Sequence, residues 1–359
     1  MKQFCLSLAL LSLTTPAFAA DPAPAPALAP SEIVAAAPKA DWVAIPASDL
    51  LIMDLAPDLK GKPRRVTIQL MPPPFSQGWI GNIRKLAAAH WWDGLSVNRV
   101  QDNYVVQWGD ADGEDQAKAR ALPVGLAKVD QEYYRIEIFD LALKSKGPTL
   151  YDPWTRPGTL DKPRPTKPPQ SIDEAAAALD RHIGALGEAI ALGRLGDSYA
   201  PFVGFAGSFA IGWAFGADRE EPTAWPIHCY GMVGVCRNLS PDTGSGAELY
   251  TVIGHAPRHL DRNIALVGRV IEGIEHLSSL PRGTGALGFY ETPEERTNIL
   301  SIRLGNEVAS LPAYEYLSTT SETFARYADA RANRRDPFFI TPAGGADICN
   351  IPVPVRRVK

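Results

Sequence analysis

Short β-type segments, each closed by turn-forming residues, constrain the fold of this chain more than any other feature of the sequence. Residues 66–70 alternate polar and apolar side chains and stop at Pro72-Pro73-Pro74, because proline cannot continue a strand. Similar runs span 98–110, 228–237, 248–254, 264–270 and 299–308. Helical spacing of apolar residues accompanies them over 80–87 and 272–280. We therefore expect a mainly β protein: a closed antiparallel barrel capped by two helices.

The composition is that of a folded protein and excludes some classes of partner. Hydrophobic residues make up 45% of the 359 residues and charged residues 21%, so the chain can bury a sizeable core without disulfides. Lys and Arg total 36 against 40 Asp and Glu, which leaves a net charge of −4. Nucleic acid is not an expected partner, because it requires a clustered cationic surface.

The N-terminal sequence predicts export. Residues 1–19 combine Lys2, an apolar stretch over 5–13 and the small-x-small sequence Ala17-Phe18-Ala19, as in a cleavable signal peptide. The apolar stretch is shorter than the roughly 20 residues that cross a membrane. We expect a periplasmic or secreted protein with no integral membrane segment after signal removal, an uncleaved anchor being the alternative. The Ala- and Pro-rich residues 20–40 predict an extended, solvated linker.

Three cysteines remain after removal of the signal: Cys229, Cys236 and Cys349. An oxidising compartment permits one disulfide among them and leaves one thiol over. Cys229 and Cys236 lie seven residues apart in one apolar run. In a strand they would point to opposite faces, so we do not expect them to bond to each other. Buried free thiols are the interpretation we favour, and the disulfide state stays open.

The sequence NRVQDNYVVQWGD, residues 98–110, carries a family resemblance. It is similar to the F-H-R-V-x-x-x-F-x-x-Q-G-G-D core signature of the cyclophilin family of peptidyl-prolyl cis-trans isomerases. Four further segments resemble that family in order and spacing: NI…L…WDG over 82–94, GMVGVCR over 231–237, ELY over 248–250, and LD…VGRV…EG over 260–273. The resemblance implies a cyclophilin-like domain over 41–310 that needs no cofactor and no metal, and that acts on proline-containing polypeptides.

The resemblance also implies which residues act on an X-Pro bond. The barrier to isomerisation comes from amide resonance, so no nucleophile is needed; a fixed cation beside an apolar pocket stabilises the twisted state. Arg99 takes the position of the family's catalytic arginine. Tyr250 is the implied second pocket aromatic, with Thr251 as the alternative. The implied substrate-binding residues are Tyr104, Val105, Gln107, Cys236, Arg237, Tyr250, His259, Leu260 and Ile264. The alternative is that these are ordinary barrel side chains.

Several positions depart from the family's pattern. Cys236 stands where alanine is usual, His259 takes a tryptophan or phenylalanine position, Ile264 replaces histidine or tyrosine, and Trp108 replaces glycine. These changes motivate a second hypothesis, a catalytically weak cyclophilin-like module that binds peptides or proteins as a chaperone or scaffold. The retained arginine at position 99 favours the isomerase, which would assist the folding of exported proteins.

Two additions to the barrel are expected. An insertion at about 111–227 is longer than a simple connection requires. It contains a β-like run over 133–139 and a helix that starts at the capping box Ser171-Ile172-Asp173-Glu174 and extends to about residue 195. A C-terminal extension over 311–359 contains an expected helix over 321–334. The sequence leaves the role of both additions and the oligomeric state open.

Three other motifs imitate sites of different chemistry, but each lacks its context. Asp242-Thr243-Gly244-Ser245 resembles an aspartic-protease strand, yet the second motif that would share its proton is missing. The sequence GTGALG over 283–288 fits G-x-G-x-x-G but follows Pro281 instead of a strand. The histidines and cysteines over 228–259 contain no C-x-x-C pair of the kind that holds zinc.

Overall fold

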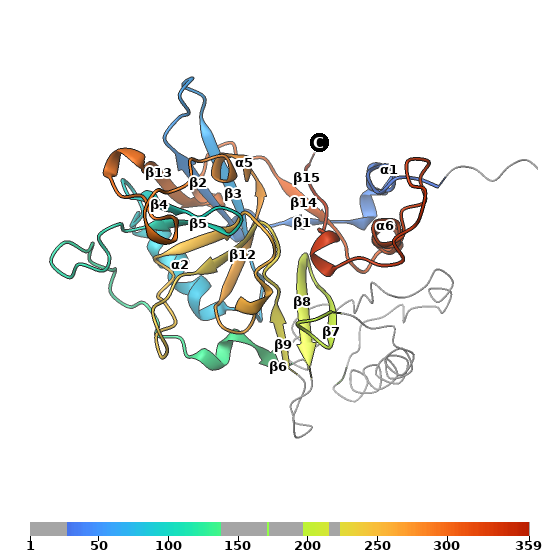
Figure 1. Cartoon of the computed structure of the whole chain (residues 1–359), viewed down its shortest axis with the longest axis horizontal. Helices are drawn as coiled ribbons and strands as arrows, with labels where there is room; N and C mark the ends of the chain where they lie inside the picture. The colour runs from blue at the N-terminus through green and yellow to red at the C-terminus, as the bar shows by residue number, and fades with distance from the viewer. Residues whose placement is uncertain (1–26, 138–170, 172–196, 215–222, 359) are drawn as a thin grey trace, which may run out of the picture.

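The computed structural model describes residues 27–137, 171, 197–214 and 223–358, and its centre is a closed antiparallel β-barrel (Figure 1). Around the barrel the strands follow the order β10-β11-β5-β4-β13-β2-β3-β12. Their bounds are β2 (Leu50–Leu55), β3 (Arg64–Leu70), β4 (Ser96–Val100), β5 (Val105–Gly109), β10 (Met232–Val235), β11 (Leu249–Val252), β12 (Leu266–Glu272) and β13 (Thr297–Leu304). The expected mainly β, closed-barrel fold is confirmed.

Alternate side chains of the strands fill the barrel, and two helices accompany it. Helix α2 (Gln77–Ala88) places Trp79, Ile83 and Leu86 in the barrel core, each fully buried. The spacing of these residues puts them on one face of the helix, as the sequence pattern indicates. The second expected helix is a single turn, α5 (Glu275–Ser278), because Pro281 soon follows it.

The N- and C-terminal segments form one sheet and one helix pair beside the barrel. Strands β1 (Trp42–Ile45), β14 (Tyr314–Leu317) and β15 (Val355–Arg357) are antiparallel neighbours. In Figure 1 this sheet lies between the barrel and helices α1 (Pro30–Ala35) and α6 (Glu322–Ala332). Helix α6 confirms the expected C-terminal helix, and the hydroxyl of Ser321 caps it by accepting from the Phe324 N–H at 3.1 Å.

The expected extended linker over 20–40 is wrong for its second half. Pro30 begins helix α1, and the Glu32 carboxylate accepts the Ala29 N–H at 2.7 Å. Ile33 is buried in one apolar cluster with Phe324 of α6. The Ala- and Pro-rich composition did not predict this helix, because its contacts come from few apolar side chains, Pro30, Ile33 and Val34. The expected signal over 1–19 lies outside the described residues.

The insertion contributes a second sheet. Its strands follow the order β6 (Ile136–Glu137), β9 (Thr223–Pro226), β8 (Phe209–Ala214) and β7 (Phe202–Ala206). The expected run over 133–139 starts later than predicted, because Gln131–Tyr134 forms the 3-10 turn η3. The helix expected to end near residue 195 lies outside the described residues.

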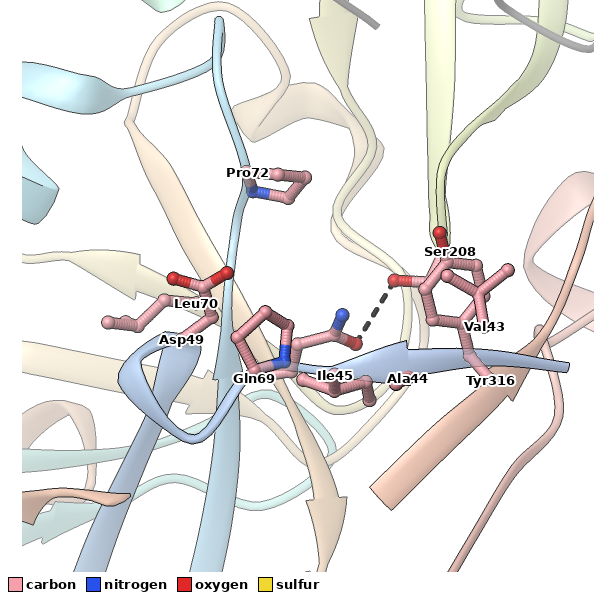
Figure 2. A pocket seen from close by; sticks show the side chains of 10 residues that line it. Val43, Ala44, Ile45, Asp49, Gln69, Leu70, Pro72, Ser208 and Tyr316 are labelled. Carbon is pink, nitrogen blue, oxygen red and sulfur yellow. Dashed lines mark hydrogen bonds between the residues drawn. The ribbon is translucent and has the colours of Figure 1, made fainter. Parts of the chain in front are cut away.

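A small cavity of about 110 Å³ marks the junction of the barrel with both additions (Figure 2). Gln69 of β3 lines it together with Ser208, in the turn between β7 and β8, and Tyr316 of β14. The Ser208 hydroxyl donates to Gln69 Oε1 at 3.0 Å. None of the expected site residues lines this cavity. The cavity therefore lies where the insertion contacts the barrel and is not part of the expected site.

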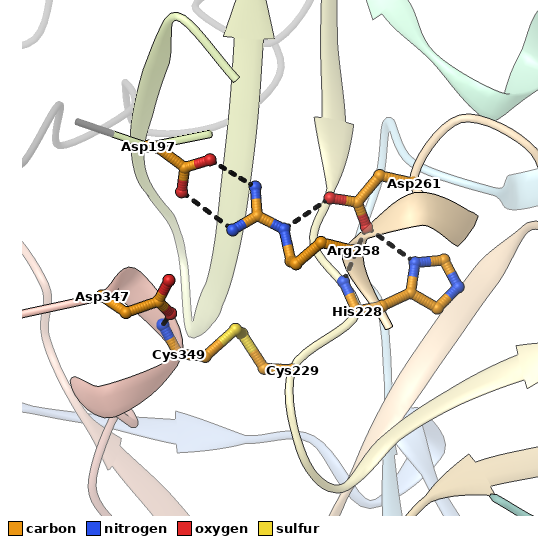
Figure 3. The surroundings of a disulfide bond; sticks show 7 residues. All are labelled: Asp197, His228, Cys229, Arg258, Asp261, Asp347 and Cys349. Atoms are coloured by element: carbon orange, nitrogen blue, oxygen red, sulfur yellow. Dashed lines mark hydrogen bonds and ion pairs between the residues drawn. A yellow bond between two sulfur atoms is a disulfide. The ribbon is translucent and has the colours of Figure 1, made fainter. Parts of the chain in front are cut away.

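Cys229 and Cys349 form a disulfide (Figure 3), which corrects the expectation of free thiols at these two positions. The bond joins residues 120 positions apart in the sequence. It forms because the 3-10 turn η9 (Ile348–Asn350) returns the C-terminal extension to the segment before β10, a long-range contact that local spacing does not show. Cys236 is free, and it does not bond to Cys229, as expected.

Candidate active site

Arg99 is a cation held in place by hydrogen bonds. It lies on β4, opposite Gln107 of β5. Its Nη1 donates to Gln107 Oε1 at 3.3 Å, and its Nη2 donates to Gln101 Oε1. Its Nε donates to the Leu287 carbonyl at 2.8 Å. Each nitrogen therefore has one partner, and two of the five guanidinium N–H groups remain free to donate.

Two aromatic rings flank this guanidinium. Its carbon lies 5.8 Å from the ring centre of Tyr104 and 5.2 Å from that of Phe289, both within cation–π range. Burial lowers the pKa of Arg99, yet an arginine stays protonated in proteins. The site thus presents a positive charge of fixed position at the edge of an apolar surface.

An apolar cluster beside Arg99 brings together five of the expected substrate-binding residues. Val105, Tyr250 and Val252 are buried in it, and three partly buried side chains pack against them: Tyr104, Cys236 and Ile264. The cluster is separate from the barrel core. We call these six residues the pocket cluster.

Strand register explains why the pocket cluster forms. β5 and β11 are antiparallel neighbours, with Val105 opposite Val252 and Gln107 opposite Tyr250. Because side chains alternate along a strand, these four face away from the barrel core. Thr251, the alternative to Tyr250, is buried on the other face, where its hydroxyl donates to the Met232 carbonyl at 3.2 Å. The sequence analysis missed Val252, although its position two residues after Tyr250 places it on the same face.

Four expected residues lie outside the pocket cluster: Gln107, which bonds to Arg99, and three others. Arg237 donates to the carbonyls of Asn263 at 3.0 Å and Asn238 at 2.7 Å, so its charge holds two loops. His259 is exposed and Leu260 half-buried, both in the 3-10 turn η5 (Arg258–Leu260). Among the described residues, Leu260 is not one of the hydrophobic side chains that pack in the pocket cluster.

Cys236 contributes an apolar wall to the pocket cluster. Burial raises the pKa of its thiol far above the neutral range. Its backbone N–H donates to the Glu248 carbonyl at 2.9 Å, which fixes the strand end at the pocket. A thiol that stays protonated acts here through its shape and not as a nucleophile.

A hydrogen-bonded series of buried polar side chains holds the Tyr250 hydroxyl in place. Its hydroxyl lies 2.8 Å from His228 Nε2, and His228 Nδ1 lies 2.8 Å from Asp261 Oδ1. A carboxylate only accepts hydrogen bonds, so Nδ1–H donates to Asp261 and Nε2 accepts the Tyr250 hydroxyl. Burial lowers the pKa of His228, which favours this neutral ring.

The same series of hydrogen-bonded side chains extends into the insertion (Figure 3). Arg258 Nε donates to Asp261 Oδ2 at 2.7 Å, and its two other nitrogens donate to Asp197 at 2.8 and 3.0 Å. Arg258 and Asp261 are almost fully buried. Asp197 belongs to the insertion, so the insertion is linked to the pocket through paired charges. In the sequence, His228 suggested only a metal ligand, and this arrangement was not predicted.

The motifs that imitate sites of other chemistry have structural explanations. The Thr243 hydroxyl donates to the Val129 carbonyl at 2.6 Å, which fixes the aspartic-protease-like segment in a loop. Residues 283–288 run beside Arg99 and contain the 3-10 turn η6 (Ala286–Gly288). The part of the chain that the structure describes holds no cluster of three potential metal ligands. Its helices also include none of the length and apolar character that crossing a membrane requires.

Comparison with known proteins identifies the family. A family model described as cyclophilin type peptidyl-prolyl cis-trans isomerase/CLD matches residues 65–304, about two-thirds of the chain. Cyclophilin AquaCyp293 from Hirschia baltica has a similar structure, with a TM-score of 0.58 and 19% sequence identity over 89% of this chain and 94% of that one. This likeness shows the fold. No curated protein sequence matches the chain.

A second solved structure is less similar. It is a cyclophilin type peptidyl-prolyl cis-trans isomerase of Cryptosporidium parvum, solved in the presence of the dipeptide Ala-Pro, with a TM-score of 0.34 and 10% identity over 70% of this chain and 98% of that one. The match of the family model over residues 65–304 and the closed barrel agree, and the chain belongs to the cyclophilin-type peptidyl-prolyl cis-trans isomerase family.

Proposed function

We propose that this protein is a peptidyl-prolyl cis-trans isomerase that acts on X-Pro bonds of exported polypeptides. The observation that carries the proposal is the fixed Arg99 guanidinium beside the pocket cluster. An X-Pro bond placed there would have its proline ring against apolar side chains. The barrier of about 18–20 kcal/mol arises from amide resonance, so the task of the site is to stabilise the twisted bond.

Arg99 suits this task because of its free donors. When the bond twists, the prolyl nitrogen leaves conjugation and its lone pair can accept a hydrogen bond. One of the two unengaged N–H groups of Arg99 would donate to that nitrogen and thus stabilise the twisted state more than the planar one. Gln107 and the Leu287 carbonyl hold the guanidinium, so it needs no reorganisation during the reaction.

The test is NMR exchange spectroscopy on a short Ala-Pro peptide, which measures cis–trans interconversion without a protease. We expect catalytic amounts of the protein to accelerate the exchange well above its spontaneous rate, which is slow at tens of seconds or more. Peptide binding with unchanged exchange would contradict the proposal and support the alternative, a module that binds proline peptides without turning them over.

Two observations support action outside the cytoplasm. Residues 1–19 have the pattern of a cleavable signal, and the Cys229–Cys349 disulfide is typical of an oxidising compartment. Proline isomerisation is slow enough to limit the folding of exported chains. N-terminal sequencing of protein from the envelope or medium should find a start near Ala20 or Asp21. Intact Met1 on cytosolic material would contradict export.

A further inference from the structure

The glycine-rich segment 283–289 is built against Arg99. Its Leu287 carbonyl accepts the Arg99 Nε–H at 2.8 Å, and Phe289 forms an isolated antiparallel bridge with Arg99. A Cβ at Gly288 would lie 2.7 Å from Gln101 Cα, so only glycine allows this close approach. The G-x-G-x-x-G pattern therefore reflects contact with the β4 strand end and not a nucleotide.

The segment leaves two large apolar side chains in solvent next to the catalytic cation. Leu287 is 66% exposed and Phe289 is 39% exposed. Leu287 also has a φ of +56°, a conformation that is uncommon for a leucine. Neither side chain belongs to a hydrophobic core among the described residues. Their exposure beside Arg99 indicates a binding surface, because the free energy falls when a ligand covers apolar side chains.

The side chains around Arg99 indicate which ligand would cover this surface. Phe289 and Tyr104 both lie within 6 Å of the Arg99 guanidinium carbon. Tyr104 belongs to the pocket cluster, whereas Phe289 does not. A peptide whose prolyl nitrogen faces Arg99 extends about 3.3–3.6 Å per residue. A residue one or two positions from the X-Pro pair therefore reaches Phe289 and Leu287.

We propose that Leu287 and Phe289 form an apolar subsite that contacts a bulky apolar side chain flanking the X-Pro pair of the substrate. This inference rests on the proposed isomerase function and adds a substrate preference to it. The preferred substrates are proline-containing segments with leucine, phenylalanine or a similar residue beside the pair. Such segments occur in unfolded chains, whose apolar residues are exposed.

The experiment compares peptides that contain Ala-Pro flanked by glycine with peptides that carry leucine on one flank or the other. Exchange rates give kcat/KM, and isothermal titration calorimetry of the same peptides gives Kd. We expect the wild-type protein to prefer a leucine-flanked peptide over the glycine-flanked one by about three- to tenfold. Leu287→Asn should remove most of this ratio. Asparagine tolerates the positive φ, so the backbone carbonyl that holds Arg99 keeps its place.

Leu59→Asn is the matched control. Leu59 is fully exposed in the turn between β2 and β3, and its replacement should leave the preference for the leucine-flanked peptide intact. Equal kcat/KM and Kd for both kinds of peptide in the wild-type protein would overturn the subsite. So would an unchanged ratio in the folded Leu287→Asn variant. Absence of exchange with every peptide would instead refute the proposed isomerase, and the calorimetric ratio would then still decide the subsite.

Discussion

Tyr250 shows how one residue combines an apolar and a polar role in this site. Its ring packs in the pocket cluster, and its hydroxyl donates to His228. The sequence predicted the ring because the position matches an aromatic one in the family. It did not predict the hydroxyl's partner, because His228 lies 22 residues away and reaches Tyr250 only through the pairing of β10 with β11. Polar networks of this kind depend on tertiary contacts that residue spacing does not encode.

Tyr250→Phe tests the support that His228 gives to the pocket. The variant keeps the ring and leaves His228 Nε2 buried without a partner, at a cost of about 1–3 kcal/mol. We expect a lower unfolding temperature and a KM raised severalfold, with kcat nearly unchanged because Arg99 is untouched. Thermal unfolding and exchange kinetics measure both effects. Tyr230→Phe, at an exposed tyrosine, is the control, and identical behaviour of the two variants would show that the His228 contact is immaterial.

Glu248 gives the protein a stability that falls as the pH rises. Burial raises the pKa of its carboxyl to about 8, although the Asp110 N–H donates to it at 2.6 Å. Unfolding returns that pKa to about 4.5. Between these values the native state binds the proton and the unfolded state releases it. The contribution of Glu248 to the free energy of unfolding is therefore largest below pH 4.5, decreases up to about pH 8 and is constant above it.

Glu248→Gln should remove this dependence. The carboxamide oxygen still accepts from the Asp110 N–H, and no charge has to be buried. We expect the variant to exceed the wild-type protein in stability by an amount that grows from pH 5 to pH 8, on the order of 4 kcal/mol at the end. Denaturant unfolding at both pH values measures the difference. Contributions of other groups, including His228 below about pH 6.5, cancel in the comparison. A difference that does not change with pH would contradict the assignment.

The prediction of strands depended on the alternation of polar and apolar side chains along a segment. Strand β3 alternates and was predicted. Strand β2, with the sequence LLIMDL, was missed because it lacks alternation. Its Leu51 and Met53 face the barrel core, whereas Leu50 and Ile52 face a second cluster with Tyr314 of β14. A strand covered on both sides reads as a continuous apolar run, which period-2 alternation does not detect.

The disulfide between η9 and the segment before β10 can be tested directly. Peptide mapping without reductant should find Cys229 linked to Cys349 and Cys236 as a free thiol. We expect Cys236 to react slowly with a thiol reagent at pH 7 in the folded protein, since burial raises its pKa, and rapidly after unfolding. A Cys229–Cys236 link would contradict the structure.

Replacing both members of the pair, Cys229→Ser with Cys349→Ser, should cost about 2–4 kcal/mol of unfolding free energy, because the crosslink restricts the unfolded chain. Cys236→Ser is the matched control, since it also loses a thiol but no crosslink. Chemical unfolding under non-reducing conditions compares the variants. If the double variant is no less stable than the control, the crosslink does not stabilise this fold.

At the scale of the whole molecule, the barrel and its additions are joined at several places around the pocket. Asp197 ties the insertion to Arg258, and Cys349 ties the C-terminal extension to Cys229, next to His228. The sequence predicted both additions from their length. Their docking was not predictable, because it depends on single long-range contacts such as these. The pocket cluster therefore belongs to the barrel, while the segments that carry the polar side chains behind Tyr250 are linked to both additions.

We propose that this barrel uses Arg99 as a fixed charge to isomerise X-Pro bonds. An arginine stays charged across the working range, so the wild-type rate should be nearly constant between about pH 6 and 9. Arg99→Lys should restore little activity, because lysine lacks the planar set of donors. Tyr104→Ala should mainly weaken peptide binding, because it removes part of the pocket wall and leaves the charge.

The most direct measurement is NMR exchange of an Ala-Pro peptide with wild-type protein and Arg99→Ala, with circular dichroism to verify folding. We expect rapid exchange with the wild-type protein and a loss of about 100-fold in the variant, the typical effect of removing one donor to the transition state. The variant's circular dichroism should be unchanged, since this half-buried side chain contributes little to the core. A folded Arg99→Ala protein that exchanges the peptide at nearly the wild-type rate would contradict the account.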